Sequence, residues 1–316
     1  MEPVPLIDVG TLPDAQFLAY TVEPSNRTWL QASGSIQSIS AALTDYTTTK
    51  NWLGAKKDTA LTRAIERLAN KPSLVLKSLP TDAPPITVAL IDSGIDTAHY
   101  QQQLRLWQNP NERADGIDNS GNGLIDDITG WDFVGADPFP EDTDGHGTMM
   151  AGLIIRQAPT AQLMNLRVLD DAGEGSMLAV SAAIDYAVHH KAQVINLSLG
   201  ANVEDSLVAA SIQRALDTGV VVVAASGNEG QSRPDFPARI PGVWAAGSIN
   251  RDGNNWKLSN GKQGKGAQYV KVVSTHVKSL RLNGGKRFVT GTSAAAARLS
   301  GVFASLLSLQ ASNNRP

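Results

Sequence analysis

The chain has 316 residues, of which 42% are hydrophobic and 18% are charged, and its formal net charge is −3. This composition is typical of a globular protein with a packed core and excludes a disordered or fibrous chain. Because lysine and arginine are scattered and no apolar run approaches the length of a membrane span, we expect no nucleic-acid partner and no membrane association.

The chain contains no cysteine, which excludes a disulfide framework, a thiolate metal site and a cysteine nucleophile. Its start, Met1-Glu2-Pro3, lacks the basic flank and the apolar stretch of a signal peptide. Both features favour a cytoplasmic location. Secretion stays open, because cysteine-free proteins are also common among secreted bacterial enzymes. The sequence predicts no oligomeric state.

The first predicted element is a helix over residues 59–70. In this segment Leu61, Ile65 and Leu68 recur at helical spacing, with charged residues between them. The pattern predicts that the helix docks by one apolar face.

Consecutive prolines at residues 84–85 follow this helix and indicate a linker, because they cannot continue a helix or a central strand. We therefore predict two regions, an N-terminal extension at residues 1–80 and a main domain at residues 81–316. The sequence leaves two roles open for the extension, an integral docked segment and a prosegment.

The main domain alternates short apolar runs with helical patterns. Runs that are rich in β-branched residues and do not alternate with polar ones suit strands buried on both faces of a parallel sheet. These runs lie at residues 86–91, 163–169, 194–199, 220–225 and 243–247, with helical patterns at residues 177–190 and 207–218. The order predicts an α/β fold, a doubly wound and mostly parallel sheet with helices on both faces.

Three polar side chains stand out by their place in this pattern. Asp92 ends the first predicted strand, at the sheet edge where α/β proteins place their sites. His146 lies between glycines, which leave an imidazole open to a neighbour, and Ser293 begins a helix of small residues whose positive end favours an anion. Taken singly, each residue also has an ordinary explanation, as a turn former, a structural histidine or a helix cap.

Together the three residues follow the order Asp, His, Ser that is found in subtilisin. The motifs Asp-Ser-Gly at 92–94, His-Gly-Thr at 146–148 and Gly-Thr-Ser at 291–293 resemble those of the subtilase family, and Ala-Ser-Gly-Asn-Glu-Gly at 225–230 resembles its oxyanion motif. The resemblance spans residues 86–310 and implies a subtilisin-like fold.

The resemblance implies a serine endopeptidase that acts on proteins or peptides. Asp92, His146 and Ser293 would be its catalytic triad and Asn228 its oxyanion donor. Ser293 would attack the scissile carbonyl while His146 takes the proton and Asp92 orients the imidazole. Two other functions stay open. A peptide transferase or macrocyclase would resolve the same acyl-enzyme with an amine, and an idle binding module would perform no chemistry.

The resemblance also implies three substrate-binding segments. The first resembles an edge strand that pairs with an extended peptide, and the other two resemble the walls of the pocket for the residue before the cut. In that order, they are Gly173, Glu174 and Gly175; Ser198, Leu199 and Gly200; and Ala225, Ser226 and Gly227. Glu174 has two interpretations, a preference for a basic residue upstream of the cut and a solvated surface charge.

An acidic insertion at residues 115–127 lies between the first two triad residues. Oxygen side chains on alternate residues, with glycines for sharp turns, are what calcium needs, and residues 131–137 resemble a calcium loop of some thermostable subtilases. We predict a calcium site and no organic cofactor, with a solvated acidic turn as the alternative. The candidate ligands are Asp118, Asn122, Asp126, Asp132 and Asp137.

Overall fold

The computed structural model describes residues 59–71, 76, 79–264 and 268–313, so the prediction for most of residues 1–80 lies outside the described residues. Seven strands form its central sheet: β1 (Thr87–Asp92), β2 (Gly130–Asp132), β3 (Gln162–Arg167), β4 (Val194–Leu197), β5 (Val221–Ala225), β6 (Trp244–Ile249) and β7 (Gln268–Val273). Their spatial order is β2-β3-β1-β4-β5-β6-β7, and every neighbouring pair is parallel.

The five apolar runs of the sequence are the strands β1, β3, β4, β5 and β6, which confirms those predictions. In β1, β4, β5 and β6 every residue is buried, as the unbroken apolar runs require. Edge strand β7 alternates buried and half-buried residues, because only one of its faces packs into the core. Strand pairing thus follows the burial pattern of each sequence segment.

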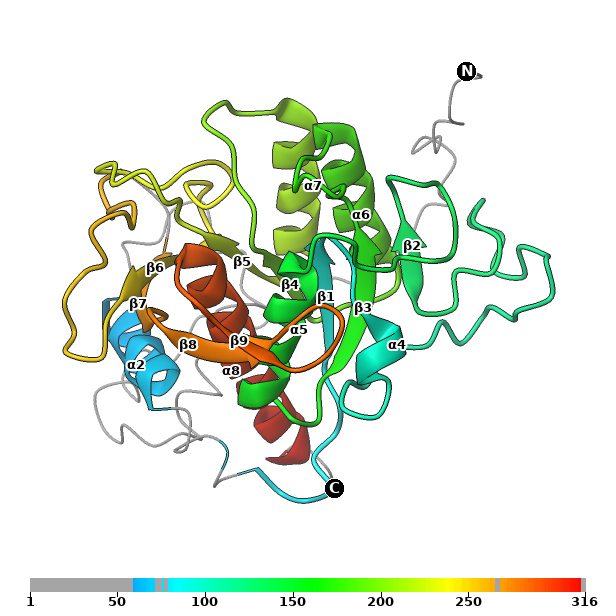
Figure 1. Cartoon of the computed structure of the whole chain (residues 1–316), viewed down its shortest axis with the longest axis horizontal. Helices are drawn as coiled ribbons and strands as arrows, with labels where there is room; N and C mark the ends of the chain where they lie inside the picture. The colour runs from blue at the N-terminus through cyan, green and yellow to red at the C-terminus, as the bar shows by residue number, and fades with distance from the viewer. Residues whose placement is uncertain (1–58, 72–75, 77–78, 265–267, 314–316) are drawn as a thin grey trace, which may run out of the picture.

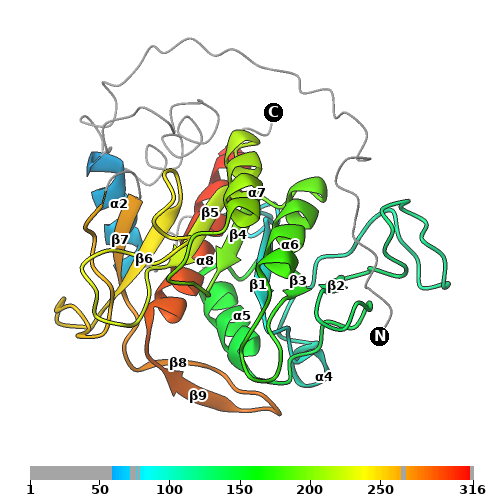
Figure 2. The same cartoon turned by 90° about the horizontal axis from the view of Figure 1, so that it is seen from above.

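Helices cover both faces of the sheet, which confirms the predicted fold class (Figure 1). On one face lie α6 (Met177–His189) and α7 (Ser206–Asp217); on the other lie α2 (Thr59–Asn70), α5 (His146–Gln157) and α8 (Thr292–Asn313). Each face has its own hydrophobic cluster. Two further elements complete the domain, the short helix α4 (Thr97–Tyr100) and a hairpin of β8 (Val277–Leu280) and β9 (Lys286–Val289) beside α5 (Figure 2).

Helix α8 corrects the expectation that no segment is long and apolar enough to cross a membrane. Among the described helices, it alone meets that test by length and composition, and 83% of its apolar window is buried inside the domain. It packs closely on α5, since a Cβ placed on Gly301 would lie 2.6 Å from both Ile154 O and Gln157 Cβ. Burial among the other elements makes it the core helix of this fold.

Helix α2 has the predicted bounds and docks by the predicted face, because Leu61, Ile65 and Leu68 are all buried. Asn70 fastens its end to edge strand β7 by donating from Nδ2 to Lys271 O (2.8 Å) and accepting from Val273 N at Oδ1 (2.7 Å). The helix therefore shares one core with the strands of the main domain. The division at residue 80 stays a prediction.

The sheet has a topological switch point at β1. After β3 the chain crosses to the other side of β1 to form β4, so the loops that follow β1 and β4 diverge. In open α/β sheets the crevice at such a point is where ligands bind. Asp92 ends β1 there, and Ser198 directly follows β4.

Candidate active site

The first functional contact joins β1 to α5. His146, the first residue of α5, lies with Nδ1 at 2.7 Å from Oδ1 of the buried Asp92. The same carboxylate oxygen accepts a hydrogen bond from Ser93 N (2.9 Å), whereas Oδ2 is buried and receives none from the described residues. Because few other donors offset its charge, the carboxylate acts strongly on the imidazole.

The electrostatics of His146 follow from this pairing. Burial is the largest influence and by itself lowers the pKa, but Asp92, with Asp144 and Asp142 beyond it, outweighs burial and raises the pKa to about 9. Nδ1–H then donates to Asp92, which leaves Nε2 as the nitrogen for proton transfer.

A third carboxylate, Asp142, holds the two loops of this pair together. Its buried side chain accepts hydrogen bonds from Ser93 Oγ (2.9 Å), Gly145 N (2.7 Å), Thr148 N (2.8 Å) and Thr148 Oγ1 (2.6 Å). Ser93 Oγ accepts in turn from Gly147 N at 2.9 Å. The sequence analysis missed Asp142, and its one signal was an acid four residues before the motif histidine.

Ser293 lies in the first turn of α8, held against the loop after β4. Its Oγ donates to Ser198 O (3.0 Å), and Ser198 Oγ donates back to Ser293 O (3.0 Å). In the part of the chain that the structure describes, the Ser293 hydroxyl makes no hydrogen bond to His146. Such bonds are often long or misaligned in unliganded sites and tighten when substrate binds.

Asn228 has its amide fixed in one orientation. Its Oδ1 accepts from Thr292 N (3.0 Å) and from Thr292 Oγ1 (2.8 Å), and Thr292 Oγ1 accepts from Gly227 N (3.2 Å). With Oδ1 occupied, Nδ2 has no acceptor among the described residues. An amide N–H held by Thr292, the residue before Ser293, suits an oxyanion formed during acyl transfer.

A family model described as the subtilase family matches residues 84–315. The chain belongs to the subtilase family. It is 38% identical over 142 residues to thermitase of Thermoactinomyces vulgaris. That match covers 42% of this chain and 51% of thermitase. It is 31% identical over 239 residues to a thermophilic serine proteinase of Bacillus sp. strain AK1, and this match covers 72% of this chain and 53% of the proteinase. This subtilase thus spans about half the length of these relatives.

Two solved structures share the fold of this subtilase. The prenylagaramide maturation protease PagA is 26% identical with a TM-score of 0.60, and the match covers 77% of this chain and 82% of PagA. A cold-adapted subtilisin-like serine proteinase is 25% identical with a TM-score of 0.58, covering 74% and 77%. These likenesses agree with the subtilisin-like fold implied by the motifs.

The structure of this subtilase brings most of the predicted substrate segments to one hollow of about 520 Å³ that begins at His146. Six of the nine residues line it: Gly173, Glu174, Gly175, Ser198, Leu199 and Gly200. The other three, Ala225, Ser226 and Gly227, end β5 and continue beyond it, and the last of them contacts Thr292 beside the nucleophile.

Residues 173–175 do not form a strand here. Gly173 and Glu174 belong to a turn that begins at Asp170. Asp170 N donates to Glu174 O (2.8 Å), and Glu174 N donates to Asp170 Oδ1 (3.0 Å). Edge pairing with a peptide therefore stays a prediction.

The predicted calcium ligands separate into two places. In the first, Asp118 accepts hydrogen bonds from the N–H groups of Gly121 (2.7 Å) and Gly123 (2.8 Å), and Asp126 accepts one from Gly116 N (3.0 Å). Asn122 lies in that same loop, where its Oδ1 accepts from Leu124 N (2.8 Å).

In the second place, Asp132 pairs with the guanidinium of Arg167 (2.5 Å), and Asp137 accepts from Phe139 N (2.8 Å). No three acidic or imidazole side chains of the described residues gather into a group that could hold a metal. The candidate ligands therefore do not come together in one site in this arrangement, and the calcium site stays a prediction.

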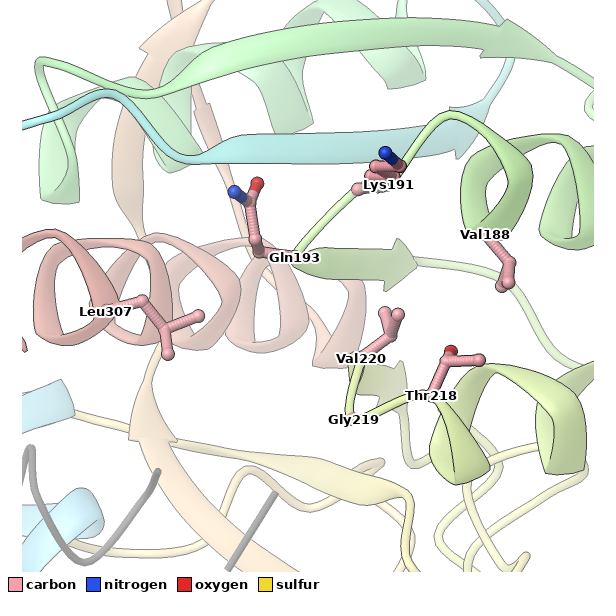
Figure 3. Close-up of a pocket in the computed structure, with 8 residues that line it drawn as sticks. Val188, Lys191, Gln193, Thr218, Gly219, Val220 and Leu307 are labelled. Atoms are coloured by element: carbon pink, nitrogen blue, oxygen red, sulfur yellow. The ribbon is translucent and has the colours of Figure 1, made fainter. Parts of the chain in front are cut away.

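A separate hollow of about 230 Å³ lies at the amino ends of β4 and β5, whereas Asp92 lies at the carboxyl edge of the sheet (Figure 3). Lys191, Gln193, Thr218 and Val220 are among its lining residues, and Gln193 Oε1 is engaged by Thr87 N at 2.7 Å. No carboxylate or imidazole lines this hollow. It therefore holds no paired carboxylate and imidazole like Asp92 and His146.

Proposed function

We propose that this subtilase is a serine endopeptidase, which hydrolyses peptide bonds through an acyl-enzyme on Ser293. The observation that carries the proposal is the pairing of the buried Asp92 with His146 at 2.7 Å. His146 and Ser198 line the same hollow, and the carbonyl of Ser198 accepts a hydrogen bond from the Ser293 hydroxyl. The names of the relatives, which include a thermophilic serine proteinase, support the same reaction.

In the acylation step, Ser293 Oγ leaves Ser198 O and attacks the scissile carbonyl while its proton passes to His146 Nε2. Asp92 keeps Nδ1 protonated and stabilises the imidazolium that forms. The oxyanion accepts hydrogen bonds from Asn228 Nδ2 and from Ser293 N, which lies in the first turn of α8 where N–H groups have no partner within the helix.

In the second half of the reaction, His146 returns the proton to the leaving amine, and a water deprotonated by His146 then releases the acyl group. A second candidate is peptide transfer, in which an amine takes the place of that water. The support for this candidate is the likeness to a maturation protease, which favours it no more than hydrolysis. The summed mass of the products distinguishes hydrolysis from peptide transfer. Hydrolysis adds one water to the substrate mass, and macrocyclisation adds none.

A catalytically idle binding module is the least supported function. Such a module requires the loss of at least one catalytic group, and this chain keeps the two triad partners in contact and orients the Asn228 amide through Thr292. Burying the Asp92 carboxylate costs free energy, and activation of His146 by this carboxylate would explain why the chain keeps it buried.

The test of the proposed function is labelling of the full chain with a fluorophosphonate, followed by mass spectrometry to locate the adduct. We expect the adduct on Ser293, and we expect none in Ser293→Ala. A protein that is folded by circular dichroism but gives no adduct on Ser293 would contradict the proposal, since the probe reacts with an assembled serine nucleophile.

Calcium binding is a lesser proposal that rests on the acidic sequence alone. If the loop at residues 115–127 rearranges around the ion, adding calcium to protein stripped with EDTA raises Tm, because a ligand that binds only the folded state stabilises it. The matched variant is Asp126→Asn, which should lose that rise. An unchanged Tm in the wild-type protein would refute the proposal.

A further inference from the structure

Residues 235–236 close the space between the two predicted pocket walls. Asp235 N donates to Ser226 O (2.9 Å) on one wall, and Phe236 pairs with Ala201 beside the other, with N···O distances of 2.7 and 3.1 Å. Each wall also contacts the start of α8. Ser198 O accepts a hydrogen bond from Ser293 Oγ, and Gly227 N donates one to Thr292 Oγ1. The segment is therefore the floor of a pocket that opens at the scissile carbonyl.

The side chain of Asp235 lies between the walls. A Cβ placed on Gly227 would lie 2.0 Å from Asp235 Oδ2, and one placed on Gly200 would lie 3.6 Å from Asp235 Cβ. The two glycines thus leave room for this carboxylate, which is 6% exposed. A buried acid therefore lies beside one glycine of each wall.

The carboxylate has no cation to neutralise it. Among the described residues its close side-chain partner is a second carboxyl, that of Glu229, and no ion pair joins it to Arg233 or Arg239. The Arg239 guanidinium is instead engaged by Glu204 Oε1 (2.9 Å) and by Asn202 O (3.2 Å). A buried charge without a partner is costly, so a basic ligand has much to gain there.

A second acid reinforces the first. Glu229 lies next to the oxyanion donor, with Oε2 accepting from Asn228 N (2.8 Å) and from Asn260 Nδ2 (2.9 Å). Burial, followed by contact with and repulsion from Glu229, raises the pKa of Asp235 to about 6, although Arg239 and Arg233 act in the opposite direction. The floor therefore becomes more negative as the pH rises through 6.

We propose that Asp235, backed by Glu229, selects a lysine or arginine as the residue immediately before the scissile bond. The inference rests on the proposed function and names its substrate class. An arginine side chain would pair with the carboxylate between the walls, whereas a neutral one would leave the two neighbouring carboxyls, Asp235 and Glu229, without a cation. A site built around a buried polar group strongly rejects substrate analogues that cannot pair with that group.

The experiment uses three quenched peptides that differ only in that residue, with arginine, its neutral isostere citrulline, or phenylalanine. For the wild-type full chain we expect kcat/KM for arginine to exceed that for citrulline by about 100-fold or more. Asp235→Asn should bring the ratio close to one. The control is Asp217→Asn at the far end of α7, which also removes one negative charge and should keep the ratio.

Fluorophosphonate labelling of Ser293 separates the two failures, because the probe carries no peptide side chain. Wild-type protein that labels but shows no preference for arginine overturns this inference and leaves the proposed function standing. Wild-type protein that does not label overturns the proposed function itself. Labelling of Asp235→Asn shows that the variant is folded and that its site is assembled.

A second measurement needs no variant. The titration of His146 affects both peptides equally, so it cancels in the ratio of kcat/KM for arginine to that for citrulline. The ratio should rise as the pH rises through about 6, because the Asp235 carboxyl ionises there. A ratio that stays flat across this range would overturn the inference.

Discussion

Thr292 holds the amide of Asn228 at two points, donating from N (3.0 Å) and from Oγ1 (2.8 Å) to Oδ1. Thr292 thus sets the orientation of the amide that we propose as the oxyanion donor. Loss of one donor at such a site costs about 10²–10³-fold in turnover, so we expect that loss for Asn228→Ala with little change in KM.

Thr292→Val should weaken the same donor indirectly. Valine keeps the shape of the side chain but cannot donate to Asn228 Oδ1 or accept from Gly227 N. We expect kcat to fall by about 10-fold, since the backbone contact still holds one side of the amide. Thr292→Ser keeps the hydroxyl and serves as the control. Equal activity of the valine and serine variants would show that the hydroxyl does not position Asn228.

The pH dependence of kcat/KM should reflect the raised pKa of His146. The free protein must lose the imidazolium proton to act, so kcat/KM should rise with pH through about 9. In Asp92→Asn the attraction is absent while burial remains, so the midpoint should move to lower pH and kcat should fall by about 10⁴-fold. A pH–rate profile of both proteins checks this.

The same pair sets a window of stability. Because the pKa of His146 is higher in the folded state than its ordinary value of 6.5, the pair contributes fully below that value and loses its contribution as pH rises through about 9. The free energy of unfolding, measured in urea, should therefore differ more between pH 6 and pH 10 for the wild-type protein than for His146→Ala. A variant with the same pH dependence as the wild type would contradict this.

Asp142→Ala should destabilise the loops that carry Asp92 and His146. The change removes the acceptor of hydrogen bonds from Ser93, Gly145 and Thr148, and hydrogen bonds to a charged group contribute about 1.5–3 kcal/mol each. We expect the free energy of unfolding to fall by about 3 kcal/mol or more, with kcat falling too. Glu141→Gln, which changes the neighbouring exposed acid, is the control.

The sequence predicted those parts of the fold that local pattern determines. Nearly continuous apolar runs identified β1 and β4, because each run lies within a few consecutive residues. Short motifs predicted Asp92, His146 and Ser293 as a triad, and the structure brings the first two into contact. These are the features for which pattern and structure agree most closely.

Other features depend on contacts far apart in the chain. Strand β2 has three residues, and β7 mixes lysine with apolar residues at a half-covered edge, so neither gives an apolar run. Asp142 and Asp235 gain their roles from loops that only folding brings together. Neither a motif nor a period carries such a signal.

The docking of α2 yields the last prediction. Asn70 joins Lys271 O and Val273 N of edge strand β7, and Ile65 is wholly buried in the same core as α8. Asn70→Ala leaves both backbone groups without the partner, which costs about 1–3 kcal/mol. Ile65→Ala opens a cavity and costs about 2–5 kcal/mol.

Denaturant unfolding of the full chain measures both changes, with the exposed Arg63→Ala as the control on the same helix. Losses of this size would identify α2 as an integral part of the domain, because a segment that the working enzyme discards adds little to its stability. If neither variant differs from the control, the helix does not stay docked in solution, and the prosegment role for the region that contains it gains support.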